Sequence, residues 1–203
     1  MKLFSVYRKL KLLIKSTSSL SDILIVDDLD DYYQLYDASI LGIKNSFSLD
    51  LGCGVNPRNP FNAKNIFGID IRENIDNKVK FADLAIEKIP FKNNFFDFIT
   101  AYDFLEHIPR VIYAPNRRNS FVELMNEIYR TLKPNGIFLS FTPVYPFMDA
   151  FSDPTHINII TPETFSLYFD DKRQRAKMYG FYGSFKVLHQ VITESHLVSF
   201  LQK

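Results

Sequence analysis

The fold is decided by a stretch of nine residues, Leu49-Asp50-Leu51-Gly52-Cys53-Gly54-Val55-Asn56-Pro57. An apolar run that ends in two closely spaced glycines is typical of a buried parallel strand followed by a turn where a ligand approaches the backbone. A dinucleotide-binding turn would carry a third glycine where Pro57 stands, and the G-x-x-x-x-G-K-[ST] pattern of a phosphate loop is absent. The negative charge of Asp50 instead favours a cationic ligand.

Around this stretch, short apolar runs alternate with helical stretches, as expected for a parallel sheet with crossover helices. Two further runs near the C-terminus meet at a short polar turn, Glu194-Ser195, which predicts an antiparallel hairpin at the end of the sheet. The sequence therefore predicts a single α/β domain with a mostly parallel, doubly wound sheet. We expect its strands at residues 46–51, 65–70, 96–101 and 136–141, and the hairpin at 185–193 and 196–201.

Capping patterns define two helices. Ser120 and Glu123 have the spacing of a capping box, and the apolar stripe that follows ends in Lys-Pro-Asn-Gly at residues 133–136. A second helix is expected to begin with Thr161 as the N-cap, followed by Pro162 in the first position.

Composition excludes several classes of protein. The chain has 203 residues, a net charge of +1 and one cysteine, so it lacks the basic character of a nucleic-acid-binding module. Cys53 cannot form an internal disulfide, which favours a reducing compartment and a cytoplasmic location. The longest charge-free hydrophobic stretch, residues 136–148, is short and broken by Pro143 and Pro146, so we expect no stable membrane insertion.

The N-terminal region is dipolar. Residues 1–16 carry five Lys or Arg and apolar residues at helical spacing, whereas residues 17–41 carry six Asp and no Lys or Arg. Two interpretations of the basic helix remain open: peripheral contact with an anionic lipid surface, or a cap helix that packs its apolar stripe on the domain. We favour the cap helix.

Acidic residues recur near the expected strand ends. Asp70 ends the second strand, where a carboxylate can accept both hydroxyls of a ribose. Asp83 lies in the next loop, where it could accept from an adenine amino group while the Leu84 N–H donates to the ring. A lone acid at such a position is usually a helix cap, but acids in this order, with Asp97 and Asp103 at the two ends of the strand expected at 96–101, favour a nucleoside site.

Taken together, these motifs resemble the class I S-adenosylmethionine-dependent methyltransferases. Later residues resemble a subgroup of small bacterial methyltransferase domains associated with glycan assembly. Asn56 departs from the family, in which a glycine is common at this position. The resemblance covers residues 46–169 and rests on 49–54, 68–71, Asp83 ahead of 89–91, 96–101, 105–108, 132–136, 153–156 and 161–165.

The resemblance implies a Rossmann-like sheet of seven strands, mostly parallel, with an antiparallel last strand. It implies one domain over residues 1–203: an N-terminal cap (1–45), a cofactor-binding core (46–142) and an acceptor-side loop, helix and hairpin (143–203). The implied cofactor is S-adenosyl-L-methionine, which leaves as S-adenosyl-L-homocysteine. The implied cofactor-binding residues are Asp50, Gly52, Cys53, Gly54, Asp70, Ile71, Asp83, Leu84, Ala101 and Tyr102.

Few residues are candidates for chemistry on the acceptor. His107 follows the strand expected at 96–101 and His156 lies on a later loop facing the same cavity, so both are candidate catalytic residues, with a structural role as the alternative. We expect Glu106 to form a capping box with Asp103, and His189 and His196 to be structural. The spacing of the histidines and the cysteine predicts no metal site.

The acceptor is expected to bind between the N-terminal cap and the loops at 109–120 and 142–158. Arg110, Arg117 and Arg118 on the first loop could bind a phosphate or carboxylate, or lie in solvent. The leading hypothesis is methyl transfer, at oxygen, to a small molecule or glycan precursor, with no nucleic-acid partner. The alternatives are a non-catalytic binding domain of this fold and an NAD-dependent oxidoreductase, which Pro57 and Asp50 disfavour.

Overall fold

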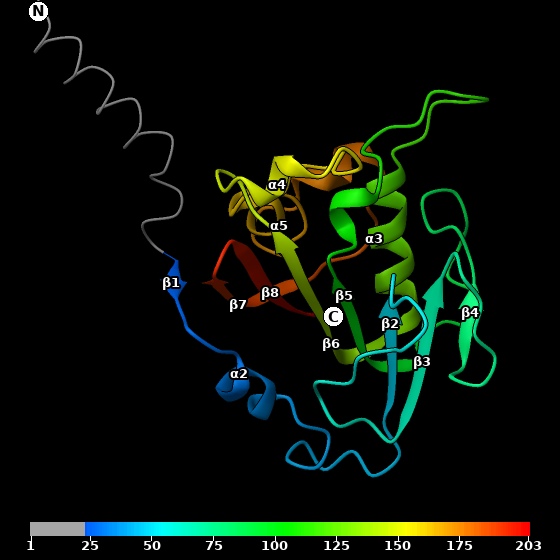
Figure 1. Ribbon diagram of the computed structural model, residues 1–203, viewed down its shortest axis with the longest axis vertical. Helices are drawn as coiled ribbons and strands as arrows, with labels where there is room; N and C mark the ends of the chain where they lie inside the picture. Colours follow the sequence, from blue (N-terminus) through cyan, green and yellow to red (C-terminus); the bar gives the residue numbers. More distant parts are fainter. Residues whose placement is uncertain (1–22) are drawn as a thin grey trace, which may run out of the picture.

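A computed structural model describes residues 23–203 of the chain, so the basic helix expected within residues 1–16 lies outside the described residues. The described part is built on one eight-stranded sheet in the order β1-β7-β8-β6-β5-β2-β3-β4 (Figure 1). Strand β8 pairs antiparallel with both β6 and β7, and the other pairs are parallel. The strands are β1 Leu24–Ile25, β2 Phe47–Leu51, β3 Asn65–Asp70, β4 Val79–Phe81, β5 Phe96–Tyr102, β6 Leu132–Pro143, β7 Lys186–Thr193 and β8 His196–Gln202.

The strand predictions hold for the centre of the sheet and fail at its edges. The mostly parallel sheet and the antiparallel last strand are confirmed, but the sheet has eight strands rather than seven. The additional strand β1 consists of two residues that pair with β7, and β4 has only three residues at the opposite edge. Strands this short carry no periodic signal, which explains why the sequence did not indicate them.

Within residues 23–203 the helices are fewer and shorter than a regular doubly wound fold would have. They are α2 Asp30–Leu35, α3 Ser120–Thr131, α4 Asp149–Ser152 and α5 Glu163–Tyr168, with 3-10 helices η1 Leu105–His107 and η2 Arg175–Tyr179. Between β2 and β3 the chain forms no helix. Pro57 and Pro60 lie in this connection, and each removes a backbone donor that a helix interior would need.

Three capping predictions for α3 and α5 are wrong. Ser120 does not cap α3 but donates its hydroxyl to the carbonyl of Ala85, and Glu123 forms an ion pair with Arg118. Helix α3 ends at Thr131, so Gly136 lies inside β6 rather than at a helix end. The third wrong prediction concerns the N-terminus of α5, where the hydrogen bond has the opposite donor and acceptor to those expected.

At α5, the hydroxyl of Thr164 accepts the N–H of Thr161 at 2.9 Å, and the helix begins at Glu163. Thr161 is therefore the donor rather than the capping side chain. A sequence pattern for a cap does not fix which of two hydroxyl residues makes the bond, because tertiary packing selects between them.

Two apolar cores cover the two faces of the sheet. One lies under α3, α5 and η2 and includes Met125, Phe138 and Phe165. The other lies under α2 and the following segment and includes Phe61 and Phe200. None of the described helices is long and apolar enough to span a membrane.

Candidate functional site

The carboxyl ends of β2, β3 and β5 lie side by side. The register pairs Leu51 with both Ile69 and Ala101, so the residues after these strands emerge at one edge of the sheet. This is the edge at which parallel α/β sheets bind ligands. The cofactor residues expected from the sequence converge here, because they lie in or just after these strands and β4.

Asp50 is buried beneath the turn rather than facing solvent. Its side chain is 1% exposed; Oδ2 accepts the N–H of Arg58 at 2.8 Å and Oδ1 accepts the hydroxyl of Thr100 at 2.7 Å. Burial raises the pKa of Asp50 to about 6, although both hydrogen bonds lower it. Asp50 therefore fixes the loop that follows the glycines and places a negative charge under it.

The two glycines of the turn are required by its geometry. Gly52 and Gly54 have φ angles of +66° and +64°, which favour glycine. A Cβ on Gly52 would lie 2.3 Å from the Phe104 ring, and a Cβ on Gly68 would lie 2.4 Å from Cys53 Sγ. The turn therefore packs tightly against the start of the segment after β5 and against β3.

Cys53 does not carry nucleophilic chemistry. Burial, reinforced by the nearby charges of Asp50 and Asp70, raises the pKa of its thiol to about 12. The thiol is therefore neutral at physiological pH and serves as packing between the two glycines.

Asp70 connects the turn to the end of β3. Its Oδ2 accepts the N–H of Gly54 at 2.8 Å, and its Oδ1 accepts both the N–H and Nε–H of Arg72 at 3.0 Å. Burial opposes ionisation, but these hydrogen bonds outweigh it and lower the pKa of Asp70. The ionised carboxylate fits a ribose diol, and the neighbouring Ile71 is 66% exposed and fits the apolar face of a base.

Asp83 and Leu84 follow β4 next to this edge. Asp83 Oδ1 accepts the N–H of Ala85 at 3.0 Å, so one carboxylate oxygen stabilises a local turn. The side chain of Leu84 is buried in the core, which leaves only its backbone for contact with a ligand.

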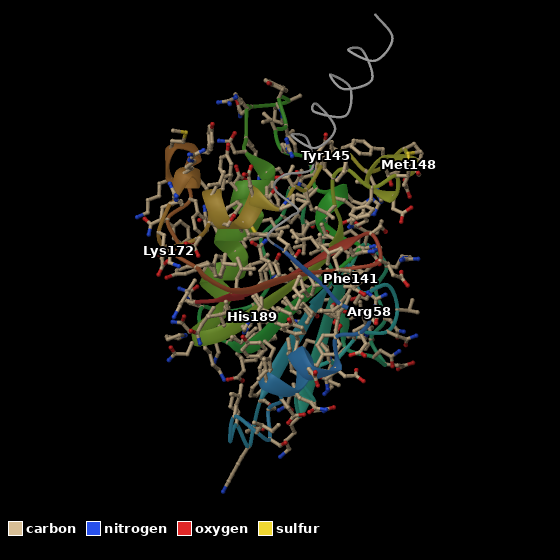
Figure 2. All side chains as sticks on the ribbon, turned by 90° about the vertical axis from the view of Figure 1, so that its left-hand side faces the viewer. Arg58, Phe141, Tyr145, Met148, Lys172 and His189 are labelled. Carbon is tan, nitrogen blue, oxygen red and sulfur yellow. The ribbon has the colours of Figure 1, made fainter. Side chains whose placement is uncertain are left out.

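Tyr102, which ends β5 at this edge, has specific partners within the chain. Its hydroxyl donates to the hydroxyl of Tyr33 in α2 at 3.1 Å, and the Arg58 guanidinium lies 4.5 Å from the ring centroid. Arg58 and Phe141, both labelled in Figure 2, contact this ring. Ala101, in contrast, is completely buried within β5. Arg58 was not expected from the sequence, because its position eight residues after Asp50 belongs to no recognised motif.

Glu106, His107 and His156 form a cluster beside this edge. Potential ligand atoms of the three side chains lie within 4.8 Å of one another, and the two imidazole centroids are 4.9 Å apart. The hypothesis that Glu106 caps a helix with Asp103 is wrong: η1 has no side-chain cap, and Glu106 is 2% exposed. One oxygen, Oε2, accepts the hydroxyl of Thr142 at 2.8 Å, and burial raises the pKa of the carboxyl. The cluster joins residues that are distant in sequence, which spacing along the chain could not indicate.

The cluster is held by backbone hydrogen bonds between its two segments. The N–H groups of Ile157 and Asn158 both donate to the carbonyl of Glu106 at 2.9 Å, and Asn158 Nδ2 donates to the carbonyl of Leu105 at 3.0 Å. The loop that carries His156 is therefore fixed to η1.

The other sequence candidates lie apart from this cluster. His189 packs among Tyr32, Tyr36 and Phe200 on the α2 face. His196 contacts Asp103, with Nε2 and Oδ1 3.0 Å apart. Asp97 lies at the opposite end of β5, where it accepts the N–H of Phe47 and pairs with Lys133, so it does not contribute to the cofactor edge.

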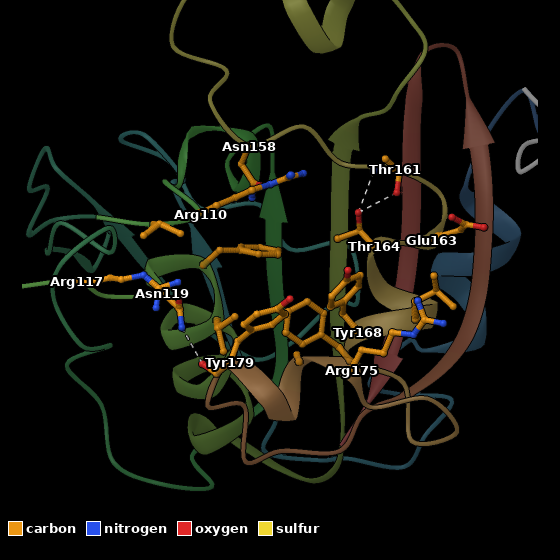
Figure 3. A pocket seen from close by; sticks show the side chains of 16 residues that line it. Arg110, Arg117, Asn119, Asn158, Thr161, Glu163, Thr164, Tyr168, Arg175 and Tyr179 are labelled. Carbon is orange, nitrogen blue, oxygen red and sulfur yellow. Dashed lines mark hydrogen bonds between the residues drawn. The ribbon is translucent and has the colours of Figure 1, made fainter. Parts of the chain in front are cut away.

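An open pocket of about 590 Å³ lies between α3, α5 and η2 (Figure 3). It includes Arg110 and Arg117 from the loop expected to contact the acceptor, together with Arg175 from η2. Arg110 is fixed by Asn158, with Nε and Oδ1 2.8 Å apart, whereas Arg118 pairs with Glu123. The three arginines of the loop thus have different environments, and two of them face this pocket.

Comparisons with known proteins agree with the geometry. Residues 49–140 match a family model described as a methyltransferase domain. The sterol 24-C-methyltransferase of Schizosaccharomyces pombe is 29% identical over 124 residues, covering 52% of this chain and 30% of that enzyme. The enzyme of the same name from Kluyveromyces lactis is 27% identical over 146 residues, covering 64% of this chain and 36% of that enzyme. The match therefore spans about a third of the length of these curated relatives.

Solved structures share the fold. A SAM-dependent methyltransferase from Archaeoglobus fulgidus superposes with a TM-score of 0.54 at 16% identity, covering 86% of this chain and 91% of that one. A Burkholderia thailandensis 1,6-didemethyltoxoflavin-N1-methyltransferase, solved with S-adenosylhomocysteine, gives 0.52 at 14% identity and covers 100% of this chain and 85% of that one. The glycine turn, the buried Asp50 and the strand-end Asp70 agree with these comparisons: residues 49–140 match a methyltransferase domain, and the chain shares the fold of S-adenosylmethionine-dependent methyltransferases.

Proposed function

We propose that the protein transfers the methyl group of S-adenosylmethionine to an oxygen of a small molecule or glycan precursor. The observation that carries this proposal is the Glu106, His107 and His156 cluster next to the cofactor turn. Phe104, two residues before Glu106, contacts Gly52, so the cluster follows directly on the turn that holds the cofactor.

The chain supplies each part of a cofactor site. Asp50 provides negative charge beneath the methionyl end, Asp70 accepts the ribose hydroxyls, and Ile71 packs on the adenine. Arg58, whose backbone binds Asp50, is positioned for the methionyl carboxylate. Asp83 keeps one carboxylate oxygen for the adenine amino group and Leu84 offers its backbone N–H, while Cys53 and Gly54 form the turn itself. S-adenosylmethionine itself supplies an activated methyl group, so the main task of the protein is orientation.

An oxygen acceptor explains the polar cluster. A hydroxyl is a weak nucleophile until its proton is removed, and Glu106, His107 and His156 offer acceptor atoms for this purpose. The sterol and toxoflavin enzymes among the relatives act on small molecules, which supports an acceptor of that class. Arg117 and Arg175, at the nearby pocket, would suit the phosphate of an activated glycan. With one unpaired cysteine, the chain suits the reducing conditions of the cytoplasm.

The cofactor part of the proposal is tested by calorimetry with S-adenosylmethionine, S-adenosylhomocysteine and NADH. We expect both adenosyl compounds to bind and NADH not to bind; the reverse result would support an oxidoreductase. Asp70→Ala should weaken cofactor binding by about 10-fold or more, because two hydroxyl contacts to a charged acceptor are lost. Asp76→Ala, an exposed acid in the following loop, is the matched control and should bind as the native chain does.

The acceptor is tested by incubation with deuterium-labelled S-adenosylmethionine and a panel of nucleotide sugars, lipid-linked glycans and sterols. Mass spectrometry should find the label on an oxygen of one class. Label on nitrogen or carbon would contradict the oxygen assignment, and cofactor binding without any labelled product would favour a non-catalytic binding domain.

A further inference from the structure

We propose that Glu106, His107 and His156 bind a divalent first-row transition-metal ion, which in turn binds the acceptor oxygen. The inference deepens the proposed function: the part that concerns binding of the acceptor oxygen rests on that function. The part that concerns metal binding rests on the side chains alone. Two imidazole nitrogens and one carboxylate form a common ligand set for such ions and leave coordination positions open.

The first observation is the state of Glu106. Its carboxyl is 2% exposed and Oε2 is bound by Thr142, but Oε1 is buried with no hydrogen-bond partner in the described chain. The nearest cationic candidate, His156 Nε2, lies 4.0 Å from this oxygen. A buried carboxylate oxygen without a partner is costly, so a group absent from the polypeptide is needed to complete the site.

The second observation is the proton on His156. Its Nδ1 lies 2.9 Å from the carbonyl oxygen of Asp149, which can only accept a hydrogen bond. Nδ1 therefore carries the proton, and in the neutral ring Nε2 presents a lone pair toward Glu106. A backbone carbonyl that fixes the tautomer in this way is the usual support of a metal-binding histidine.

The third observation is the proton on His107. Its Nδ1 lies 3.0 Å from Thr155 Oγ1, and this hydroxyl donates its single proton to Asp153 Oδ1 at 2.6 Å. The hydroxyl must then accept from Nδ1–H of His107, so Nε2 of His107 also presents a lone pair. A chain of Asp, Thr and His thus sets the second tautomer.

Acceptor atoms of the three side chains that lie within 4.8 Å of one another repel unless a proton or a cation lies between them, and a cation would satisfy all three at once. Ligand distances of about 2.0–2.2 Å are typical of Zn²⁺ with nitrogen and oxygen, so an ion would draw these atoms together from their present spread of up to 4.8 Å. The backbone hydrogen bonds between η1 and residues 157–158 hold the two segments in place while the side chains adjust. The two imidazole ligands favour ions such as Fe²⁺, Ni²⁺ and Zn²⁺ over Ca²⁺ and Mg²⁺.

Such an ion would activate the acceptor directly. It would bind the acceptor hydroxyl and lower the pKa of that hydroxyl, so that the proton leaves to water. The oxygen then forms a bond to the methyl carbon while the carbon–sulfur bond breaks. The bonding pair stays on sulfur, and neutral S-adenosylhomocysteine leaves. In this step the imidazoles serve as ligands, and the positive charge of the ion stabilises the negative charge on the acceptor oxygen.

The test measures metal binding without relying on turnover. The full chain is treated with chelator, titrated with Co²⁺ and followed by visible absorption, with Zn²⁺ and Mn²⁺ titrated by calorimetry. We expect one Co²⁺ per chain, with affinity reduced about 100-fold or more in His156→Gln and Glu106→Gln. We expect a loss of about 10-fold in Thr155→Val, which removes only the support of His107. His189→Gln, on the opposite face of the sheet, should bind Co²⁺ as the native chain does.

Two results would overturn the proposal. One is the absence of saturable Co²⁺, Zn²⁺ and Mn²⁺ binding by the native chain, which does not depend on any variant folding. The other is Co²⁺ binding of equal affinity in the native chain and in both ligand variants, with circular dichroism confirming that the variants fold. Cofactor binding to the metal-free chain, measured separately, distinguishes failure of this site from failure of the methyltransferase assignment.

Discussion

The cofactor edge and the acceptor cluster lie next to each other but are completed in different ways. At the cofactor edge each carboxylate already has partners: Asp50 binds Arg58 N–H and Thr100, and Asp70 binds Gly54 N–H and Arg72. In the cluster, Glu106 keeps one buried oxygen without a partner. The cofactor edge is therefore preformed, and we expect substitutions there to change the free energy of unfolding. The cluster is completed only when a ligand binds, and we expect substitutions there to change the rate of methyl transfer alone. The following variants test this difference.

The largest effect is expected for Gly52→Ala. Its Cβ would lie 2.3 Å from the Phe104 ring at a φ of +66°, so strain and overpacking add. We expect the free energy of unfolding to fall by about 3–5 kcal/mol and cofactor binding to be lost. Urea denaturation and calorimetry measure the two effects.

Gly42→Ala is the matched control, because Gly42 has a φ of +70° but no atom within 4 Å of the added Cβ. It should lose only about 1 kcal/mol, the cost of the backbone conformation. Equal losses in the two variants would show that the close approach to Phe104 contributes nothing.

The next effect concerns the buried charge of Asp50. Its pKa rises from 3.8 to about 6 on folding, so the native chain retains a proton that the unfolded chain loses between these values. The contribution of Asp50 to stability therefore falls as pH rises through this window, by about 3 kcal/mol. Asp50→Asn should gain stability relative to the native chain by up to this amount at pH 7 and by little at pH 4, yet bind the cofactor more weakly.

Thermal and urea unfolding from pH 4 to pH 8 would measure the Asp50 effect, with Asp76→Asn as an exposed control. If the difference in the free energy of unfolding between Asp50→Asn and the native chain did not vary with pH, the raised pKa of Asp50 would be contradicted. The same variant separates the two roles of this carboxylate: Asn keeps an oxygen for the Arg58 N–H but not the charge.

At the acceptor cluster, Glu106→Gln should reduce methyl transfer by about 100-fold. The amide can still accept the Thr142 hydroxyl, so we expect the free energy of unfolding to stay within about 1 kcal/mol of the native value. Initial rates and urea denaturation measure both. A loss of stability as large as that of Gly52→Ala would mean that the cluster is structural, and the contrast with the cofactor edge would fail.

The same contrast explains what could be predicted from the sequence. The turn after β2 is encoded by adjacent residues, so its glycines and acids identified the edge, and β3 has the bounds that were expected. The cluster depends on tertiary packing. The Asp103 and Glu106 pattern fits a helix cap equally well, and only the approach of Thr142 from β6 and of the loop carrying His156 decides otherwise. The edge strands β1 and β4 were missed for a related reason, since their neighbours rather than their own periodicity form them.

The smallest effect is expected for Arg72→Ala. The Arg72 side chain is 69% exposed and its Nε binds Asp70 Oδ1, the carboxylate assigned to the ribose. Removing it frees an acceptor for a ribose hydroxyl and takes a positive charge away from a cationic cofactor. We therefore expect cofactor affinity to rise a few-fold at low salt and the gain to shrink as salt screens the charge. Calorimetry at two salt concentrations, with exposed Arg173→Ala as control, measures this. A tenfold loss of affinity would mean that Arg72 itself contacts the cofactor, and that the edge, like the cluster, is completed only when its ligand binds.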